Sequence, residues 1–342
     1  MNVPVWVWLA TIALVVGMIV FDFVGHVRKP HEPTLRESAV WSIGYIAFAL
    51  VFGLGVGLFS GWTYGGEYVA GWLTEKALSV DNLFVFLLIM TSFAVPKIYQ
   101  QKVLLIGIAM AIVMRGIFIA IGAVVIEQFA WVFYLFGAVL FVLAYKQLKE
   151  AVSDEDEHDD QGDSRLIRMV RRVIPTSSQY DGDKLRTRVD GRAMFTPMFL
   201  VIVAIGLTDL LFAFDSIPAI FGLTQEPYLV FTANAFALLG LRQLYFLIGG
   251  LLERLVYLAH GLSVILAFIG VKLVLHALHE NNLPFLNGGE PVPVWTIPTW
   301  LSLLVISGTI AVAAVASLIT SRRRAAAAAD AAPVEAPAPA RD

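Results

Sequence analysis

The sequence contains no cysteine among its 342 residues. Disulfide bonds, thiol redox relays, iron–sulfur clusters and cysteine-ligated zinc sites all need that side chain, so they are excluded for this chain on its own. Any part that the protein takes in redox chemistry therefore has to be indirect.

Charge is also scarce: 15% of the residues are charged, whereas 58% are hydrophobic. Soluble domains carry about 25% charged residues. About half of the charge lies in residues 150–195 and 322–342, which leaves 25 charged residues among the other 275. We interpret the chain as an integral membrane protein. Its Lys and Arg residues form no basic stripe, which argues against a nucleic-acid partner.

Long apolar runs give the fold class. A helix needs about 20 apolar residues to span the hydrocarbon core of a bilayer. The first run has neither a basic segment before it nor a small-residue cleavage site after it, so we expect a retained helix and not a signal peptide. The runs predict an all-α, polytopic membrane protein with about nine transmembrane helices, near residues 4–24, 39–59, 66–94, 103–126, 129–149, 197–222, 228–251, 255–275 and 298–320.

The positions of the basic residues predict the orientation. All but four of the 24 Lys and Arg residues follow the odd-numbered runs, and the loops near 60–65, 127–128, 223–227 and 276–297 contain none. Cytoplasmic loops are the ones that carry an excess of Lys and Arg. We therefore expect a bacterial-type inner (plasma) membrane, with the N-terminus outside and the C-terminus in the cytoplasm.

The runs and loops together divide the chain into six parts. In the long cytoplasmic loop, the acidic run 153–160 favours disorder and the basic stretch 165–172 favours a surface helix. The Ala- and Pro-rich tail is predicted to be a disordered cytoplasmic segment, and we assign it no function. The parts are two N-terminal helices (1–60), a three-helix unit (61–149), the charged loop (150–196), a second three-helix unit (197–276), an outer loop with the last helix (277–321) and the tail (322–342).

The two three-helix units share a motif. Each has a threonine, a carboxylate and, six residues later, a second carboxylate followed by Asn or Ser. The two copies are Leu73-Thr74-Glu75-x5-Asp81-Asn82 and Leu207-Thr208-Asp209-x5-Asp215-Ser216. Each unit then carries an arginine seven residues before a glycine, at Arg115 and Arg242. Because three helices form each unit, the second would cross the membrane in the opposite sense, which predicts an inverted repeat of the kind found in many transporters.

Ionisable residues within membrane spans are costly and are functional by default. Inversion would set Asp81 level with Asp209, and Glu75 level with Asp215, in two layers of paired carboxylates. Pro218 would interrupt the second motif helix by removing a backbone donor. The motif offers only hard oxygen ligands, which suit Mn²⁺, Mg²⁺ or Ca²⁺ better than Zn²⁺ or Cu²⁺.

At these residues the sequence resembles a known family. The segments Ser79-Val-Asp-Asn-Leu-Phe-Val-Phe, Thr208-Asp-Leu-Leu-Phe-Ala-Phe-Asp-Ser-Ile-Pro-Ala and Gly240-Leu-Arg-Gln-Leu-Tyr-Phe resemble the TerC family of integral membrane proteins, and the acidic central loop resembles its Alx branch. The resemblance covers about residues 38–275. It implies a part in manganese efflux, tellurium resistance or metal supply to exported enzymes, and the Alx branch has been labelled a redox modulator.

The resemblance and the repeat together give the candidate metal ligands: Glu75, Asp81, Asn82, Asp209, Asp215 and Ser216. A second group is expected close to them: Thr74, Thr208, Asn234, Arg115 and Arg242. We interpret the arginines as counter-ions, because an arginine beside a cation would repel it. Asn234 is either a ligand or an interhelical hydrogen-bonding residue. The alternative for the carboxylates is structural, with Arg115, Arg242 or Lys76 pairing them to fix helix packing.

These features predict an exporter of a divalent cation, with manganese first. Protons are the expected counter-ion, because an emptied carboxylate cluster is neutralised by binding them. The expected partners are thus the metal ion, protons and membrane lipid, with no permanently bound cofactor and no enzymatic activity. A homo-oligomer is left open. The chain has no Gly-rich phosphate-binding loop of its own to drive transport.

Three other functions stay open at this point. One is a membrane protein of tellurium resistance or redox modulation, and another is a scaffold that delivers metal to exported proteins. The third is an intramembrane aspartyl hydrolase, in which two aspartates share a proton. The Gly-x-Gly-Asp context of such an enzyme is absent, because Asp209 follows Gly206-Leu-Thr.

Overall fold

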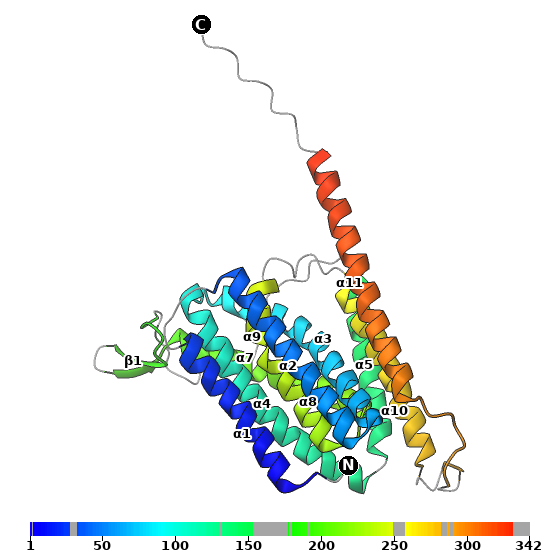
Figure 1. Ribbon diagram of the computed structural model, residues 1–342. Coiled ribbons are helices and arrows are strands. Elements are labelled where there is room, and N and C mark those ends of the chain that lie inside the picture. Colours follow the sequence, from blue (N-terminus) through cyan, green and yellow to red (C-terminus); the bar gives the residue numbers. More distant parts are fainter. Residues whose placement is uncertain are drawn as a thin grey trace.

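The computed structural model describes residues 1, 3–27, 33–129, 131–152, 177, 180–189, 192–248, 257–281, 286, 287 and 290–330. They form a bundle of long helices with a short hairpin at its side (Figure 1). The predicted all-α polytopic fold is confirmed. The acidic run 153–160, the basic stretch 165–172 and the end of the tail at 331–342 lie outside the described residues.

The elements follow the chain in a simple order. They are α1 (Val5–Asp22) with a π-helical turn η1 (Phe23–Val27), α2 (Leu35–Ser60), α3 (Trp62–Ser92), α4 (Lys97–Gln128), α5 (Val132–Val152), β1 (Arg186–Val189), β2 (Arg192–Phe195), α7 (Pro197–Phe221), α8 (Pro227–Leu239), α9 (Leu241–Ile248), α10 (Leu258–His279) and α11 (Thr299–Asp330).

Eight segments within the described residues are long and apolar enough to span a membrane. The predicted span that is missing from these eight is the third, which corresponds to α3. This helix has 31 residues but carries several ionisable ones, Glu67, Glu75 and Lys76 among them. Its polar residues, and not its length, set it apart. The eight segments are Val5–Gly25, Leu35–Ser60, Lys97–Ile126, Val132–Lys149, Pro197–Phe221, Pro227–Leu247, Leu258–His279 and Thr299–Ser321.

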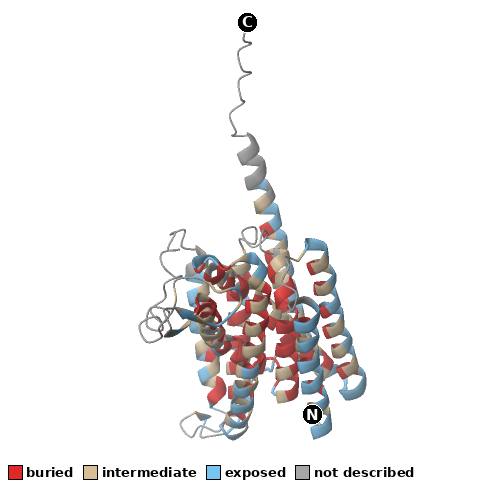
Figure 2. Cartoon of the chain, turned by 90° about the vertical axis from the view of Figure 1, so that its left-hand side faces the viewer, coloured by how far each residue is buried: buried red, intermediate tan, exposed pale blue. Residues whose placement is uncertain are grey.

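Helix α3 lies inside the bundle, which explains how it tolerates this polarity. It packs against α2, α7, α8, α9, α10 and α11. Buried residues face the interior of the bundle, whereas large apolar side chains are exposed on outward faces such as those of α1, α2 and α11 (Figure 2). An apolar exterior around a partly polar interior is the arrangement that a lipid environment selects.

Glycines allow α2 and α3 to fold back on each other almost without a loop. Gly61 joins the two helices with φ at 113°, a conformation that side-chain-bearing residues rarely adopt. A Cβ atom at Gly65 would lie 2.8 Å from Gly57 Cα, so the two backbones are in direct contact there. Small residues commonly permit such close packing of membrane helices.

Helices α3 and α7 run antiparallel. Glu67 contacts Thr224, Gly71 lies against Ile220, and Glu75 shares a partner with Ser216, so residue numbers rise on one helix as they fall on the other. Glu75 is therefore within one residue of its predicted level beside position 215. An inverted repeat requires this arrangement, but the symmetry of the two units stays a prediction.

Two local expectations are wrong. Helix α7 continues past Pro218 to Phe221, because so near the helix end the loss of one donor does not break it. Helix α11 continues to Asp330, into the segment expected to be disordered, because the alanines at 325–329 have the highest helix propensity. The predicted span 228–251 corresponds to one candidate span, Pro227–Leu247, within which α8 and α9 meet at Gly240.

The charged loop contains a hairpin that its composition did not suggest. Strands β1 and β2 pair antiparallel, and the segment before them is tied to the helix ends: Tyr180 donates a 2.7 Å hydrogen bond to the Phe93 carbonyl. Lys102 pairs with Asp183 at 2.5 Å, and this hydrogen bond lowers the pKa of the Asp183 carboxyl. The loop is therefore anchored to α3 and α4 at this end of the bundle.

The contact at Gly65 makes a stability prediction. Replacing Gly65 with Ala should destabilise the protein by about 1–3 kcal/mol, because the added methyl group meets backbone that cannot move aside. The matched change Gly55→Ala in α2 meets nothing within 4 Å and should be neutral or slightly stabilising. Thermal unfolding in detergent measures both. Equal midpoints for the two variants would contradict the α2–α3 packing described above.

Candidate functional site

One fully buried arginine organises the centre of the bundle. Arg115, on α4, donates from Nη2 to Asp209 Oδ1 at 2.9 Å and from Nε to Asp209 Oδ2 at 3.3 Å. Its Nη1 atom contacts the Glu75 carboxylate and donates to Ser216 Oγ at 2.9 Å. Arg115 therefore joins α3, α4 and α7 through charge-assisted hydrogen bonds, two of them in the bidentate geometry that a guanidinium favours.

Helical spacing brings these groups together. Asp209 and Ser216 are seven residues apart on α7, which places them on one face of that helix. Ser79 follows Glu75 by one turn on α3 and donates a hydrogen bond of 3.3 Å to its carboxylate. We call the set Glu75, Ser79, Arg115, Asp209 and Ser216 the central cluster. All five residues are buried.

The two carboxylates of the central cluster share one guanidinium. Glu75 Oε2 is buried and has no hydrogen-bond partner among the described residues. Burying charge is costly unless it is paired and hydrogen-bonded, so this oxygen is the least satisfied part of the cluster. The cluster can take a further cation or a proton more readily than it can take an anion.

The remaining predicted residues fall into three groups. Asn82 is buried, and the buried Thr74 hydroxyl and Asn234 Nδ2 have no hydrogen-bond partner in the described part of the chain. Thr208 is half-buried. Asp81 and Asp215 lie within α3 and α7, but their side chains are outside the described part, so their predicted roles stay predictions.

Arg242 belongs to a different cluster. Its Nη2 atom pairs with Asp22 Oδ1 at 3.1 Å, and its Nη1 atom donates to Gln101 at 2.7 Å. Arg115 and Arg242 occupy equivalent positions in the sequence motif, yet only Arg115 contacts motif carboxylates through the bonds described here. Sequence reasoning missed Asp22, although a lone carboxylate near the end of the first apolar run was an available signal.

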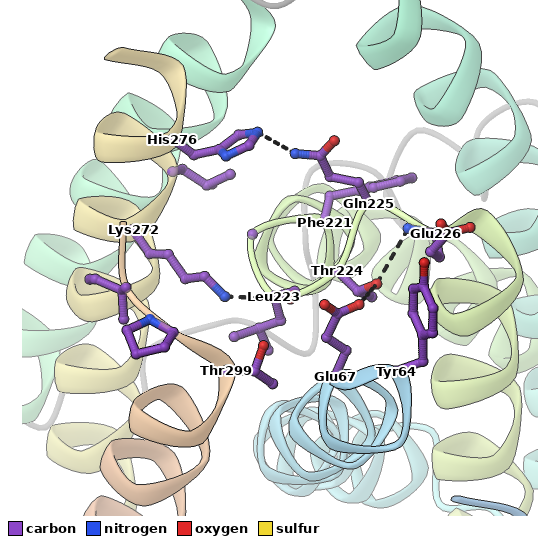
Figure 3. Close-up of a pocket in the computed structure, with 14 residues that line it drawn as sticks. Tyr64, Glu67, Phe221, Leu223, Thr224, Gln225, Glu226, Lys272, His276 and Thr299 are labelled. Carbon is purple, nitrogen blue, oxygen red and sulfur yellow. Dashed lines mark hydrogen bonds between the residues drawn. The ribbon is translucent and has the colours of Figure 1, made fainter. Parts of the chain in front are cut away.

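A second polar feature lies at the start of α3. A cavity of about 310 Å³ opens between that end of α3, the α7–α8 turn, α10 and the start of α11 (Figure 3). We call it the α3 cavity. Its charged and polar lining includes Glu67, Glu226, Lys272, His276 and Thr299. These residues were not among the sequence candidates, although Glu67 lies within the predicted third span.

The described side chains do not by themselves form a closed metal site. No group of three or more His, Asp or Glu residues within the described part of the chain is placed to hold a metal ion. The central cluster instead has two carboxylates, two hydroxyls and an arginine in the position of a cation.

The burial of Arg115 predicts a large stability effect. Removing one partner of a buried ion pair costs about 3–5 kcal/mol, so Arg115→Met should lower the thermal unfolding midpoint strongly, whereas Arg188→Met at an exposed hairpin position should not. Combining Arg115→Met with Glu75→Gln and Asp209→Asn removes all three charges and should restore much of the loss. A single variant as stable as Arg188→Met would show that the guanidinium is not held between carboxylates.

Comparisons with known proteins give the family. Residues 60–325 match the integral membrane protein TerC family. An uncharacterized membrane protein of Mycobacterium tuberculosis is 52% identical over 319 residues, which cover 93% of this chain and 80% of that protein. No solved structure matches the chain.

Two further relatives carry descriptive names. The putative membrane-bound redox modulator Alx of Escherichia coli is 39% identical over 72% of this chain and 78% of its own. The thylakoid membrane protein TERC of Arabidopsis thaliana is 44% identical over 71% of this chain and 62% of its own. The family match covers most of the sequence and includes every residue of the central cluster, as the resemblance of the motifs implied. This chain therefore belongs to the TerC family of integral membrane proteins.

Proposed function

We propose that the protein exports a divalent cation, with manganese as the favoured ion, by way of the central cluster. The observation that carries this proposal is the burial of Glu75 and Asp209 around Arg115 inside a bundle of membrane-spanning helices. A purely structural role would not need these charges, since well-packed apolar residues commonly replace a buried ion pair without loss of stability. Ionisable groups at such positions usually mark an ion path.

In this proposal the Arg115 guanidinium holds the place of the ion while the site is empty. It neutralises Glu75 and Asp209 and keeps both carboxylates facing the same point. A divalent cation would compete with the guanidinium for these oxygens, beginning from the unpartnered Oε2 atom of Glu75. Carboxylate and hydroxyl oxygens are ligands that Mn²⁺ accepts, whereas Zn²⁺ and Cu²⁺ sites usually include His or Cys. Asp81 and Asp215 remain the predicted additional ligands.

Export and proton coupling complete the proposal. The orientation with the N-terminus outside and the C-terminus in the cytoplasm rests on the Lys and Arg distribution and on the hairpin that ties the charged loop to one end of the bundle. Protons would neutralise the carboxylates after the ion leaves. The direction of transport and the choice of manganese rest on the family resemblance together with the ligand type.

The geometry favours transport over the other functions considered. An aspartyl hydrolase would need Asp81 and either Asp209 or Asp215 to share a proton, whereas Asp209 is bound through both carboxylate oxygens by the Arg115 guanidinium. We therefore propose that the protein is not an enzyme. One relative is named a putative redox modulator, but this chain has no cysteine, so a redox effect would have to follow from metal movement. A metal-delivery scaffold would depend on the charged loop 150–196, and transport would not.

Charge removal at the central cluster tests the proposal. Glu75→Gln and Asp209→Asn each remove one negative charge that would face the ion. The attraction between two opposite unit charges about 4 Å apart is about 4 kcal/mol at an effective dielectric of about 20, so each variant should bind the ion much more weakly. Cells that carry either variant, or Asp81→Asn or Asp215→Asn, should accumulate manganese and become sensitive to it. Tolerance of zinc and copper should change little.

The matched control is Asp183→Asn, which removes a carboxylate charge outside the membrane spans. Cellular manganese content and growth in manganese provide the measurements, and expression in the membrane is checked for each variant. If all four intramembrane variants insert normally and behave like Asp183→Asn, the carboxylates serve only helix packing.

A dependence on pH follows from the same chemistry. Protons and metal ions compete for the carboxylates of the central cluster, so metal binding should release protons and apparent affinity should weaken as pH falls. Titration of the purified protein with Mn²⁺ at a series of pH values, with proton release followed in weak buffer, measures this. An affinity that stays constant between about pH 5 and 8 would argue against carboxylate ligands.

A further inference from the structure

Helices α3 and α7 meet along a ladder of three levels, one helical turn apart. At the inner level, Glu75 and Ser216 both bind Arg115 Nη1. At the outer level, Thr224, just after α7, donates a 2.7 Å hydrogen bond to Glu67 Oε2. The middle level is apolar. The two polar levels are therefore aligned on the same pair of segments, eight residues or about 12 Å apart along α3.

The middle level is thin and tightly closed. A Cβ atom at Gly71 would lie 3.2 Å from Ile220 Cγ2 and 3.5 Å from Ala233 Cβ, so α3, α7 and α8 are in contact with no side chain from residue 71 between them. Only this level of small and apolar groups separates Glu67 from the central cluster along α3. Because Gly71 has no side chain, α3 packs closely against α7 and α8 at this level.

The outer level opens into the α3 cavity (Figure 3). Two carboxylates line it, Glu67 and Glu226, and Glu226 contacts the amino group of Met1. Lys272 donates to the Leu223 carbonyl at 3.4 Å, and His276 contacts Gln225 and pairs with Glu280 at 3.2 Å. Glu67 therefore belongs both to the lining of the cavity and to the outer level of the α3–α7 contact.

We infer that the α3 cavity is an outer vestibule of the cation path, in which Glu67 contacts a hydrated divalent cation on its way between the outer face and the central cluster. This inference rests on the proposed function. Three observations support it: the cavity exists, Glu67 lines it, and Glu67 is aligned with Glu75 on one face of α3. The loops at this end carry no Lys or Arg, so the outer approach does not repel cations.

Lys272 has a place in this path that resembles that of Arg115. It is a cation held by α10 beside the α7–α8 turn, and it lines the cavity together with Glu67. A passing divalent cation would compete with Lys272 for Glu67 as it competes with Arg115 for Glu75. The outer vestibule would hold the ion more weakly than the central cluster, because Glu226 is already paired with the Met1 amino group and leaves Glu67 as the carboxylate that faces the ion.

Transport and binding measured together test this inference. In proteoliposomes, Glu67→Gln should slow Mn²⁺ transport about tenfold through loss of the single attractive charge, whereas equilibrium Mn²⁺ binding by the purified full chain should stay within about twofold of the unmodified protein. Glu290→Gln is the matched control, since it removes an exposed outer carboxylate that does not line the cavity. Thr224→Val, which removes the hydrogen-bond partner of Glu67 but no charge, should have a smaller effect than Glu67→Gln.

The absence of native cysteine allows a second, independent measurement. In intact cells, a membrane-impermeant thiol reagent added outside should label Glu67→Cys and Gln225→Cys but not Ser79→Cys at the central cluster. External Mn²⁺ should slow the labelling of Gln225→Cys. Labelling of the cavity positions only from the cytoplasmic side would overturn the inference.

The outcomes separate the two proposals. If Glu67→Gln transports like Glu290→Gln while Glu75→Gln abolishes transport, the vestibule is wrong and the proposed function stands. If the unmodified protein moves none of the divalent cations Mn²⁺, Mg²⁺ and Ca²⁺, the proposed function is wrong and the vestibule is overturned with it.

Discussion

The burial of Arg115 between two carboxylates is the interaction on which the rest of the interior depends. A guanidinium inside a membrane bundle is tolerable only if its donors are satisfied, and Glu75, Asp209 and Ser216 satisfy several of them. Those partners come from α3 and α7, so the arginine fixes how these helices face each other and α4. The antiparallel register of α3 and α7 and the position of Gly71 against Ile220 are consistent with this one constraint.

Polarity in the interior also dictates which helices must surround α3. A helix that carries Glu67, Glu75 and Lys76 could not face lipid along its length. It is covered by six other helices, and Lys76 donates to the Ala237 carbonyl at 3.0 Å, two residues before α8 ends at Leu239. The free backbone carbonyls near the end of a helix are natural partners for such a side chain. The break between α8 and α9 therefore lies where a buried cation needs an acceptor.

The sequence predicted the long helices well because apolar length is a strong, local signal. Motif spacing also placed Glu75, Asp209 and Ser216 among the candidates, and the structure brings these three together. Partners could not be predicted in the same way. Arg115 and Arg242 look equivalent in the sequence, yet one binds motif carboxylates and the other binds Asp22, because pairing depends on which helices pack together. Glu67 was missed because it became informative only once Thr224 and the α3 cavity were placed beside it.

The length of α11 has a consequence for the segment that follows it. The helix runs for 32 residues from Thr299 to Asp330, and its membrane-spanning part ends at Ser321. At 1.5 Å per residue the whole helix is about 48 Å long, against about 30 Å for the hydrocarbon core. In Figure 1 its end projects well beyond the other helices. The arginines at 322–324 directly follow the candidate span Thr299–Ser321, the place where basic residues commonly flank a membrane helix. Six residues follow Arg324 in the helix, so α11 carries Asp330 about 9 Å past the arginines and well beyond the length that a membrane span needs.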